Sequence, residues 1–459
     1  MDGNNSINYY KTINDVLRRL EETYGHTFKD YDINHRLNNP KNKGALGNIV
    51  EEGIFGYKIN SSPEADLAHL GLEIKTTAVI QNKNNSYRAK ERLTLESLNY
   101  FKVIEQDFDN SDLWNKIKKM LLVIYEYVDG LNYGDMKIVK GIVHEFDEED
   151  LMIIKRDYQK IVDTIKKGKA HELSESDTLY LGACTAGTGK LQSQPFSNLK
   201  AKQRKFSLKN SYITQLIRHY VSKTELEHIA NAEQLLTKTF EEIVEERLKK
   251  YYGQSEFVLS EMFDLNSVAK SKFELLIAKM LGIQGKVNQT DEFAKANITL
   301  KTIRVLRTGK IKESMSFPAF SFEDIVNKTW EECDFRFFLE SQKFLFAIFE
   351  EVNGEFVFKR IKFWNMPESL IENDFSKVYN ELKSKLKSGD VVKTINHKGV
   401  VYNNFPGIKF NQYFHVRPHA RTAKDTDKLP VPDKKTGVTK FTKQCFWLNN
   451  DFVAKIIND

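Results

Sequence analysis

The feature of the sequence that most constrains its fold is an internal repeat. Four segments of the first half recur in the second half, in the same order and at a nearly constant offset of 223 to 240 residues. The matching pairs are 43–56 with 270–283, 66–80 with 292–306, 121–130 with 344–354, and 206–217 with 446–457. Repeats of this length indicate duplicated domains, because the repeats of a solenoid span only about 20–45 residues.

Helix-like and strand-like segments alternate along both halves, which predicts an α/β protein. The apolar run at 121–128 predicts a buried strand, and residues 149–167 predict a helix. Residues 232–253 predict one amphipathic helix between the halves, with an apolar side made of Leu236, Phe240, Ile243 and Val244. With 459 residues, 41% of them hydrophobic, the chain can bury two cores. The expected parts are a domain at 1–225, a helical connector at 226–255 and a second domain at 256–459.

The second copy keeps the apolar frame of the first but changes its acidic positions. The aligned pairs of residues are Asp66 and Glu292, Glu73 and Thr299, Glu51 and Ala278, and Lys75 and Lys301. A structural salt bridge would be expected to persist in both copies. The selective change of acids therefore indicates one active and one degenerate site.

The residues around Glu73 have the character of a divalent-cation site. Residues two apart on a strand point to the same face, so Glu73 and Lys75 emerge together while Leu72 and Ile74 enter the core. Two carboxylates, from Glu73 and the nearby Asp66, repel each other unless a positive charge lies between them. Mg²⁺ suits this arrangement because it prefers oxygen ligands and keeps several waters. Such an ion can bind a phosphate oxygen and lower the pKa of a bound water, which is the chemistry of phosphodiester hydrolysis.

The same pattern has an ordinary structural alternative. A surface Glu-x-Lys pair on a solvated edge strand, beside an unrelated loop aspartate, would match residues 66–75 equally well, and D-x6-E-x-K alone is a weak motif. The run GTGK at 187–190 resembles part of a phosphate loop. It has Cys184 where the first glycine is needed and Leu191 where Ser or Thr is needed, so no nucleotide cofactor is expected.

The run KGALGNIVE at 43–51 and the run SPEADLAHLGLEIKT at 62–76 together resemble the nuclease core of the MutH-type endonucleases. These enzymes belong to the PD-(D/E)xK superfamily and include a mismatch-repair nickase and GATC-specific type II restriction endonucleases. Similarity extends through residues 171–189 and 198–221. The two-domain length is similar to the restriction branch. The resemblance implies tandem restriction-endonuclease-like domains, each a mixed sheet flanked by helices, with a catalytically degenerate second copy.

The resemblance also implies roles for individual residues. Asp66 and Glu73 match the metal ligands, Lys75 matches the catalytic lysine, and Glu51 matches an acid carried by a helix, which could hold a metal-bound water or a second ion. Lys116 aligns with a further active-site lysine. A surface lysine that snorkels before a buried strand is the alternative for Lys116.

Two basic stretches are candidates for phosphate contacts. Residues 200–209 contain five basic residues and no acid, and residues 415–424 follow an aromatic segment; a solvated basic face is the alternative. The nickase carries an Arg-Pro-Lys loop where this chain has Gly-Ala-Cys-Thr-Ala-Gly at 182–187. It also has a tyrosine, associated with sensing adenine methylation, at the position of Ser207, so no adenine-methyl sensitivity is predicted. The predicted DNA-binding residues are Lys43, Thr185, Lys190, Lys202, Arg204, Lys205, Ser207, Lys209, Arg417, His419 and Arg421.

Together these features predict a Mg²⁺-dependent type II restriction endonuclease that cuts both strands of duplex DNA at GATC. One active centre per chain implies self-association of two chains on DNA. The carboxyl-terminal half would bind DNA or regulate without cutting. Two hypotheses compete with this one: a mismatch-repair-type GATC nickase, and a DNA-binding protein without catalysis.

The remaining expectations concern the environment of the protein. No apolar run is long enough to span a membrane, and the amino terminus lacks the pattern of a secretory signal, so a cytoplasmic protein is expected. The three cysteines, Cys184, Cys333 and Cys445, are too few and too scattered for a disulfide framework and are expected to be free thiols.

Overall fold

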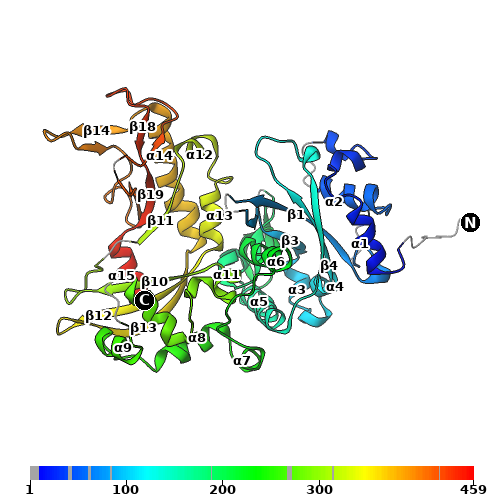
Figure 1. Ribbon diagram of the computed structural model, residues 1–459, viewed down its shortest axis with the longest axis horizontal. Coiled ribbons are helices and arrows are strands. Elements are labelled where there is room, and N and C mark those ends of the chain that lie inside the picture. The colour runs from blue at the N-terminus through cyan, green and yellow to red at the C-terminus, as the bar shows by residue number, and fades with distance from the viewer. Residues whose placement is uncertain are drawn as a thin grey trace, which may run out of the picture. The chain divides into compact units, whose positions relative to one another are not determined.

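The chain divides into two compact units (Figure 1). The computed structural model describes residues 10–39, 44–59, 64–82, 85–187, 189–265, 271–312, 315–422 and 424–459. Unit 1 comprises Met1–Phe240 and Gln289–Asn297, and unit 2 comprises Glu241–Asn288 and Ile298–Asp459. The segment 226–255, expected as a connector, is divided between the units at Phe240. Unit 1 therefore includes a short segment from the second half of the sequence.

Unit 1 is built on a mixed four-stranded sheet in the order β2-β1-β4-β5. Its strands are β1 Glu73–Gln81, β2 Tyr87–Ala89, β4 Met120–Glu126 and β5 Ile138–His144. β1 pairs parallel with β4, and the other pairs are antiparallel. Every residue of β4 from Met120 to Tyr125 is buried, and a strand covered on both faces reads as one continuous apolar run. The buried strand that the sequence predicted in this region is confirmed.

A second sheet of unit 1 is antiparallel and has the order β3-β9-β6. Its strands are β3 Leu93–Leu98, β6 Leu181–Thr185 and β9 Arg204–Leu208, and a hairpin of β7 Leu191–Gln194 and β8 Ser197–Lys202 precedes β9. The helices of unit 1 are α1 Ile13–Glu21, α2 Ala45–Ile49, α3 Tyr100–Val103, α4 Asp112–Ile117, α5 Glu148–Lys166, α6 Asn210–Ser222, α7 Ala232–Thr237 and α11 Asp291–Ala296. The expected helix at 149–167 is thus confirmed as α5.

One core of unit 1 lies between the first helices and the main sheet. The N-cap of α1 is Thr12, whose side chain forms a capping box with the side chain of Asp15. Side chains from α1, α2, β1 and β4 form one buried cluster that includes Val16, Leu20, Leu46, Ile49, Leu72, Ile74, Ala78, Leu121 and Val123. Leu72 and Ile74 therefore enter the core, as the strand periodicity predicted.

Unit 2 contains a mixed sheet in the order β10-β12-β13 and an antiparallel sheet in the order β11-β19-β16. Its strands are β10 Ile298–Val305, β11 Met315–Ala319, β12 Lys343–Val352, β13 Glu355–Asn365, β14 Val392–Ile395, β15 Val401–Asn403, β16 Phe414–Pro418, β17 Thr426–Lys428, β18 Lys440–Thr442 and β19 Gln444–Leu448. Its helices are α8 Phe240–Lys249, α9 Glu256–Met262, α10 Lys272–Leu281, α12 Phe322–Asn327, α13 Asp334–Ser341, α14 Ser376–Ser388 and α15 Asn450–Asn458.

The sheets of the two units share one pattern of pairing. In unit 1, β1 is parallel to β4 and β4 is antiparallel to β5; in unit 2, β10 is parallel to β12 and β12 is antiparallel to β13. The second sheets, β3-β9-β6 and β11-β19-β16, also match strand for strand in chain order. The recurrence of segments in the sequence thus has a matching recurrence in the order of strands.

The single amphipathic helix predicted at 232–253 is wrong. The structure has two helices there, α7 and α8, separated at Lys238, whose backbone is extended with φ −129° and ψ 152°. Thr237 and Thr239 flank the break, and β-branched residues lose side-chain freedom in a helix. Leu236, expected on the buried side, is 65% exposed, whereas Leu235 is buried.

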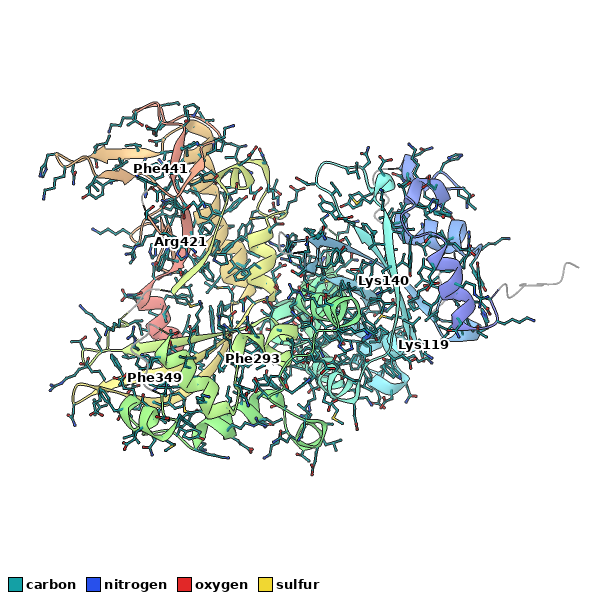
Figure 2. The ribbon with its side chains drawn as sticks, viewed as in Figure 1. Lys119, Lys140, Phe293, Phe349, Arg421 and Phe441 are labelled. Atoms are coloured by element: carbon teal, nitrogen blue, oxygen red, sulfur yellow. The ribbon has the colours of Figure 1, made fainter. Side chains whose placement is uncertain are left out.

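α11 is an integral part of unit 1, although its residues come from the second repeat. The Lys295 ammonium lies 2.8 Å from a carboxylate oxygen of Asp150 in α5, and both side chains are almost fully buried. The Glu292 carboxylate accepts hydrogen bonds from the backbone amides of Ile229 and Ala230. Phe293 is buried and packs edge-to-face on Phe240 at 6.0 Å (Figure 2).

Within the described ranges, no helix is both long enough and apolar enough to cross a bilayer. Cys184, Cys333 and Cys445 are all buried and unpaired by any disulfide. The expectation of free thiols is therefore confirmed.

Candidate active site

A tight turn brings Asp66 beside the first residue of β1. The short 3₁₀ turn Ala68–Leu70 ends at Gly71, which has a positive φ of 60°, a conformation that glycine adopts without strain. The Asp66 carboxylate accepts a hydrogen bond of 2.9 Å from the Ile74 amide, and the Asp66 amide donates one of 3.3 Å to the Glu73 carboxylate. Backbone hydrogen bonds thus hold the two acids next to each other.

Lys75 lies on the same side of β1 as Glu73, as the spacing predicted. Its ammonium lies 2.6 Å from Oε1 of Glu73. The Glu73 side chain is only 3% exposed and that of Lys75 is 17% exposed. Burial raises the pKa of Glu73, Lys75 opposes that effect, and the negative charge of Asp66 adds to it. The group is therefore a buried ion pair beside a second carboxylate, and the alternative of a solvated surface pair is wrong.

Glu51 is carried to the same site by an irregular turn of helix. α2 continues at Val50–Ile54 as a π-helical turn, a rare geometry that occurs frequently at functional sites. Burial raises the pKa of Glu51 to about 7, and the negative charges of Asp66 and Glu73 contribute to the rise, while Lys75 opposes it. Burial and neighbouring carboxylates raise the pKa of both Glu51 and Glu73, and such a concentration of acids favours a bound cation.

The carboxylates also fit the requirements of a particular kind of cation. Among the described residues, no three His, Cys, Asp or Glu side chains are placed closely enough to hold a metal ion by themselves. Mg²⁺ is commonly bound by one or two carboxylates, with waters and substrate phosphate completing its coordination. Asp66 and Glu73 supply two such carboxylates, so the donor set fits Mg²⁺ better than an ion that needs a complete protein cage.

Lys116, at the end of α4, faces these acids, whereas Lys118 is exposed. The Lys116 ammonium lies 2.8 Å from a carboxylate oxygen of Glu96 in β3. Burial lowers the pKa of Lys116, but Glu96, followed by Glu73 and Asp66, more than offsets this effect, so the pKa is raised. Lys116 is therefore held as a cation near the acidic cluster.

The sequence interpretation missed Glu96. In β3 the residues Leu93, Leu95 and Leu98 are buried, so the pattern places Glu96 on the outer face of a strand, where an acid is ordinary. Nothing in its distance along the chain from Lys116 indicates that the two side chains meet. Only the packing of α4 against β3 creates the pair.

The structure places the predicted DNA-binding residues in three different environments. Exposed residues are Lys190, Arg417, His419 and Arg421, and half-buried residues are Thr185, Lys202 and Lys205. Buried residues are Arg204, Ser207 and Lys209. Lys43 lies outside the described residues.

Two of the buried members, Arg204 and Lys209, have structural partners. Arg204 donates a hydrogen bond to the carbonyl of Ala183, across the pair of strands β6 and β9. The Lys209 ammonium is fully buried and donates to the carbonyls of Thr178 and Ala296. The expectation that Arg204, Ser207 and Lys209 face DNA is therefore corrected, because the side chains of these residues, two in β9 and one at the N-cap of α6, are buried.

In unit 2 the aligned positions have a different arrangement. Thr299 accepts a hydrogen bond from the Gln342 side chain at 3.1 Å, and Ala278 is buried in α10. Burial lowers the pKa of Lys301, and among the described residues only Glu274 opposes this effect. Within this part of the chain, Lys301 therefore lacks the cluster of acids that surrounds Lys75. The Glu292 carboxylate accepts hydrogen bonds from the backbone amides of Ile229 and Ala230, which belong to unit 1.

A mixed sheet with paired acids and a lysine at the start of its parallel strand is the arrangement that the resemblance to MutH-type nucleases led us to expect. The family model described as DNA mismatch repair enzyme MutH matches residues 55–157, which contain Asp66, Glu73, Lys75 and Lys116. Two relatives described as DNA mismatch repair protein MutH, from Shewanella sp. (strain W3-18-1) and Vibrio campbellii, are 25% and 23% identical over 45% of this chain, covering 95% and 94% of their own lengths.

A third relative aligns with both units. The type II restriction enzyme Sau3AI from Staphylococcus aureus is 33% identical over 98% of this chain and 99% of its own length. The chain therefore belongs to the family of type II restriction endonucleases that includes this enzyme. The resemblance to MutH-type endonucleases that the sequence motifs indicated is confirmed.

Proposed function

We propose that the chain is a Mg²⁺-dependent endonuclease that cuts both strands of duplex DNA at GATC and leaves 5′-phosphate ends. The observation that carries this proposal is the hydrogen-bonded group of Asp66, Glu73 and Lys75, with Glu51 beside it. The GATC sequence rests on the resemblance to MutH-type enzymes, and by the same analogy the cut falls before G.

The residues of the cluster divide the chemistry between them. Asp66 and Glu73 would hold the cation, which when bound supplies charge neutralisation at the phosphate and a more acidic water. Lys75 is placed to orient the attacking water through a hydrogen bond. Glu51, whose carboxyl is half neutral near pH 7 without a metal, is placed to accept a proton from that water. Lys116 would face the negative charge that develops on the phosphate.

We further propose that unit 2 is a degenerate copy of unit 1 that binds DNA without cutting it. Its sheets have the same order of strands, but its aligned acids are lost or bound elsewhere. Arg417 lies over the ring of Trp447 at 5.2 Å, and His419 lies edge-on to the same ring, which gives unit 2 an exposed cationic and aromatic surface. A palindromic double cut then needs two chains, one for each strand.

The direct test is incubation of unmethylated plasmid with purified protein and Mg²⁺, followed by sequencing of the fragment ends. The proposal expects double-strand breaks with four-base 5′ overhangs at every GATC. Failure to make double-strand breaks, together with nicking of a hemimethylated GATC duplex assayed in parallel, would support a mismatch-repair nickase instead. Binding without any cleavage would support a DNA-binding protein.

The metal-free protein should lose stability as the pH rises through the pKa of Glu51. The folded-state pKa of Glu51, about 7, is above the ordinary value of 4.5, so its contribution is fully present below pH 4.5 and is lost as pH rises through 7. The expected loss is on the order of 1 kcal/mol, because solvent screens a partly exposed group. Thermal unfolding in EDTA between pH 5 and pH 8 measures it.

Two variants make this pH test specific. Glu51→Gln should flatten the decline, because the amide does not ionise. Glu52→Gln is the matched control: the Glu52 carboxylate pairs with Arg36 at 2.7 Å, which lowers its pKa, so this variant should keep the decline. An unchanged pH dependence in Glu51→Gln would contradict the assignment of Glu51 to the cluster.

A further inference from the structure

The connection between α14 and β16 in unit 2 contains a hairpin that has no equivalent in unit 1. In unit 1, α5 and β6 are joined by residues 167–180, which form only short 3₁₀ turns. In unit 2 the corresponding connection contains β14 and β15, which pair with each other and with no other described strand. The hairpin extends away from α14 in Figure 1.

The base of this hairpin is firmly attached to unit 2. The buried Asp433 carboxylate accepts hydrogen bonds from the amides of Val391 and Val392. Phe405, which follows β15, packs edge-to-face on Phe441 of β18 at 5.9 Å (Figure 2). These contacts fix the direction of the hairpin even though its strands have no other sheet partner.

The outer part of the hairpin is ordered but exposed. Asn396 closes the turn by accepting hydrogen bonds from the amides of Lys398 and Val400. Large apolar side chains nevertheless face solvent: the exposed fractions are 51% for Ile395, 49% for Val400, 43% for Val401 and 52% for Tyr402. A two-stranded ribbon is marginally stable by itself in water, and a cluster of exposed apolar residues marks an interaction surface.

The charge around the hairpin identifies the kind of partner. No Asp or Glu occurs from Val391 to Lys424, whereas this stretch contains six Lys or Arg residues, including the exposed Lys393 and Lys398. The adjacent Asp390 is paired with Lys385 at 3.0 Å. A second copy of the chain would place this positive surface against itself in a two-fold contact, so a polyanion is the better complement.

We propose that the β14–β15 hairpin enters a groove of duplex DNA. The major groove, about 12 Å wide, admits a two-stranded ribbon and is about 8.5 Å deep. β14, Val392–Ile395, extends over about 10 Å at about 3.3 Å per residue, so the tip reaches the base edges. Lys393 and Lys398 contact phosphates, and Ile395 and Tyr402 lie against the sugar and base surfaces. This inference rests on the proposed function, because it assigns the DNA contact of unit 2.

Hydrogen exchange of the full chain carrying Asp66→Ala, with and without a short GATC duplex, tests the proposal. Exchange of amides 393–402 should slow about tenfold with DNA, while α9 stays unchanged. The variant Ile395→Ser/Tyr402→Ser should lose this protection and keep protection in residues 181–209. Lys393→Ala/Lys398→Ala should reduce the slope of log affinity against log salt by about 2.

Matched controls and contrary outcomes separate the alternatives. Val258→Ser/Met262→Ser on α9 removes two exposed apolar side chains of unit 2 and should leave the DNA-dependent protection intact. An unprotected hairpin with DNA bound at 181–209 would overturn the inference. Protection that grows with protein concentration in the absence of DNA would assign the hairpin to self-association. If DNA protects no amide from exchange, and the chain without the Asp66→Ala substitution does not cleave DNA, the proposed function itself is contradicted.

Discussion

We expect replacement of Asp66 by asparagine, or of Lys75 by methionine, to lower the rate of DNA cleavage about a thousandfold or more while the full chain still binds duplex DNA. Asp66→Asn removes a charge from a pair of carboxylates that would hold the cation, and Lys75→Met removes the cation 2.6 Å from Glu73. A loss of about 4 kcal/mol in transition-state stabilisation corresponds to this rate. Single-turnover cleavage of a GATC duplex measures the rate, and fluorescence anisotropy measures binding.

Unit 2 offers a matched control for this experiment. Lys301 is aligned with Lys75, stands at the same place on a strand parallel to its neighbour, and is also largely shielded from solvent. Lys301→Met should therefore leave the single-turnover rate within about threefold of the wild-type rate. Cleavage by Lys75→Met within tenfold of wild type would contradict the assignment of the catalytic centre to unit 1.

We expect replacement of Lys295 by methionine to destabilise unit 1 by about 3–5 kcal/mol, because it leaves the Asp150 carboxyl buried without its cation. Burial raises the pKa of Asp150 to about 6, with Lys295 opposing the rise. Without Lys295 the pKa of Asp150 should rise further, so the folded protein must hold this carboxyl in its protonated form. The loss should be larger at pH 8 than at pH 5, since the carboxyl is already neutral at low pH.

Hydrogen exchange of α5 and α6 amides, read separately from unit 2, measures this change in stability. Lys169→Met is the matched control, because the Lys169–Glu172 pair is more than half exposed and should contribute less than about 1 kcal/mol. The double variant Asp150→Asn/Lys295→Met should recover part of the loss. A loss below about 1 kcal/mol in Lys295→Met would show that α11 is dispensable for unit 1.

The role of α11 changes how a deletion of the second half must be designed. A chain that ends near residue 255 lacks unit 2, but it also lacks Lys295 and Glu292, which complete unit 1. Reduced cleavage by such a chain would then reflect an unstable unit 1. Deletions that test the DNA-binding role of unit 2 therefore need to retain residues 289–297.

Local patterns in the sequence were sufficient for the strands and for part of the site. Strand periodicity alone placed Glu73 and Lys75 on one side of β1 and Ile74 in the core, because alternation along a strand depends only on neighbouring residues. The apolar run that forms β4 could likewise be recognised from neighbouring residues alone. The single helix at 232–253 failed because a break at one extended residue, Lys238, outweighs an amphipathic pattern that continues on both sides.

Other features depend on contacts between residues far apart in the chain. The pairing of Lys116 with Glu96, and the inward direction of Lys209, follow from how helices pack against sheets. Basic composition predicted Arg204 and Lys209 as DNA contacts, yet buried carbonyls accept hydrogen bonds from both. The composition of a segment gives its charge, but it does not show whether a charged side chain meets solvent, a phosphate or a buried carbonyl.

The sequence by itself indicated the recurring segments, the buried strand β4 and the placement of Glu73 and Lys75 on one side of β1, because these are matters of spacing and residue type. Only the tertiary structure decided that α11, a piece of the second repeat, belongs to unit 1, and that Glu51 shares an electrostatic site with Asp66 and Glu73. The physical reason is that burial sets the strength of a charge interaction. Burial depends on the whole fold around a residue and cannot be obtained from its neighbours in the chain.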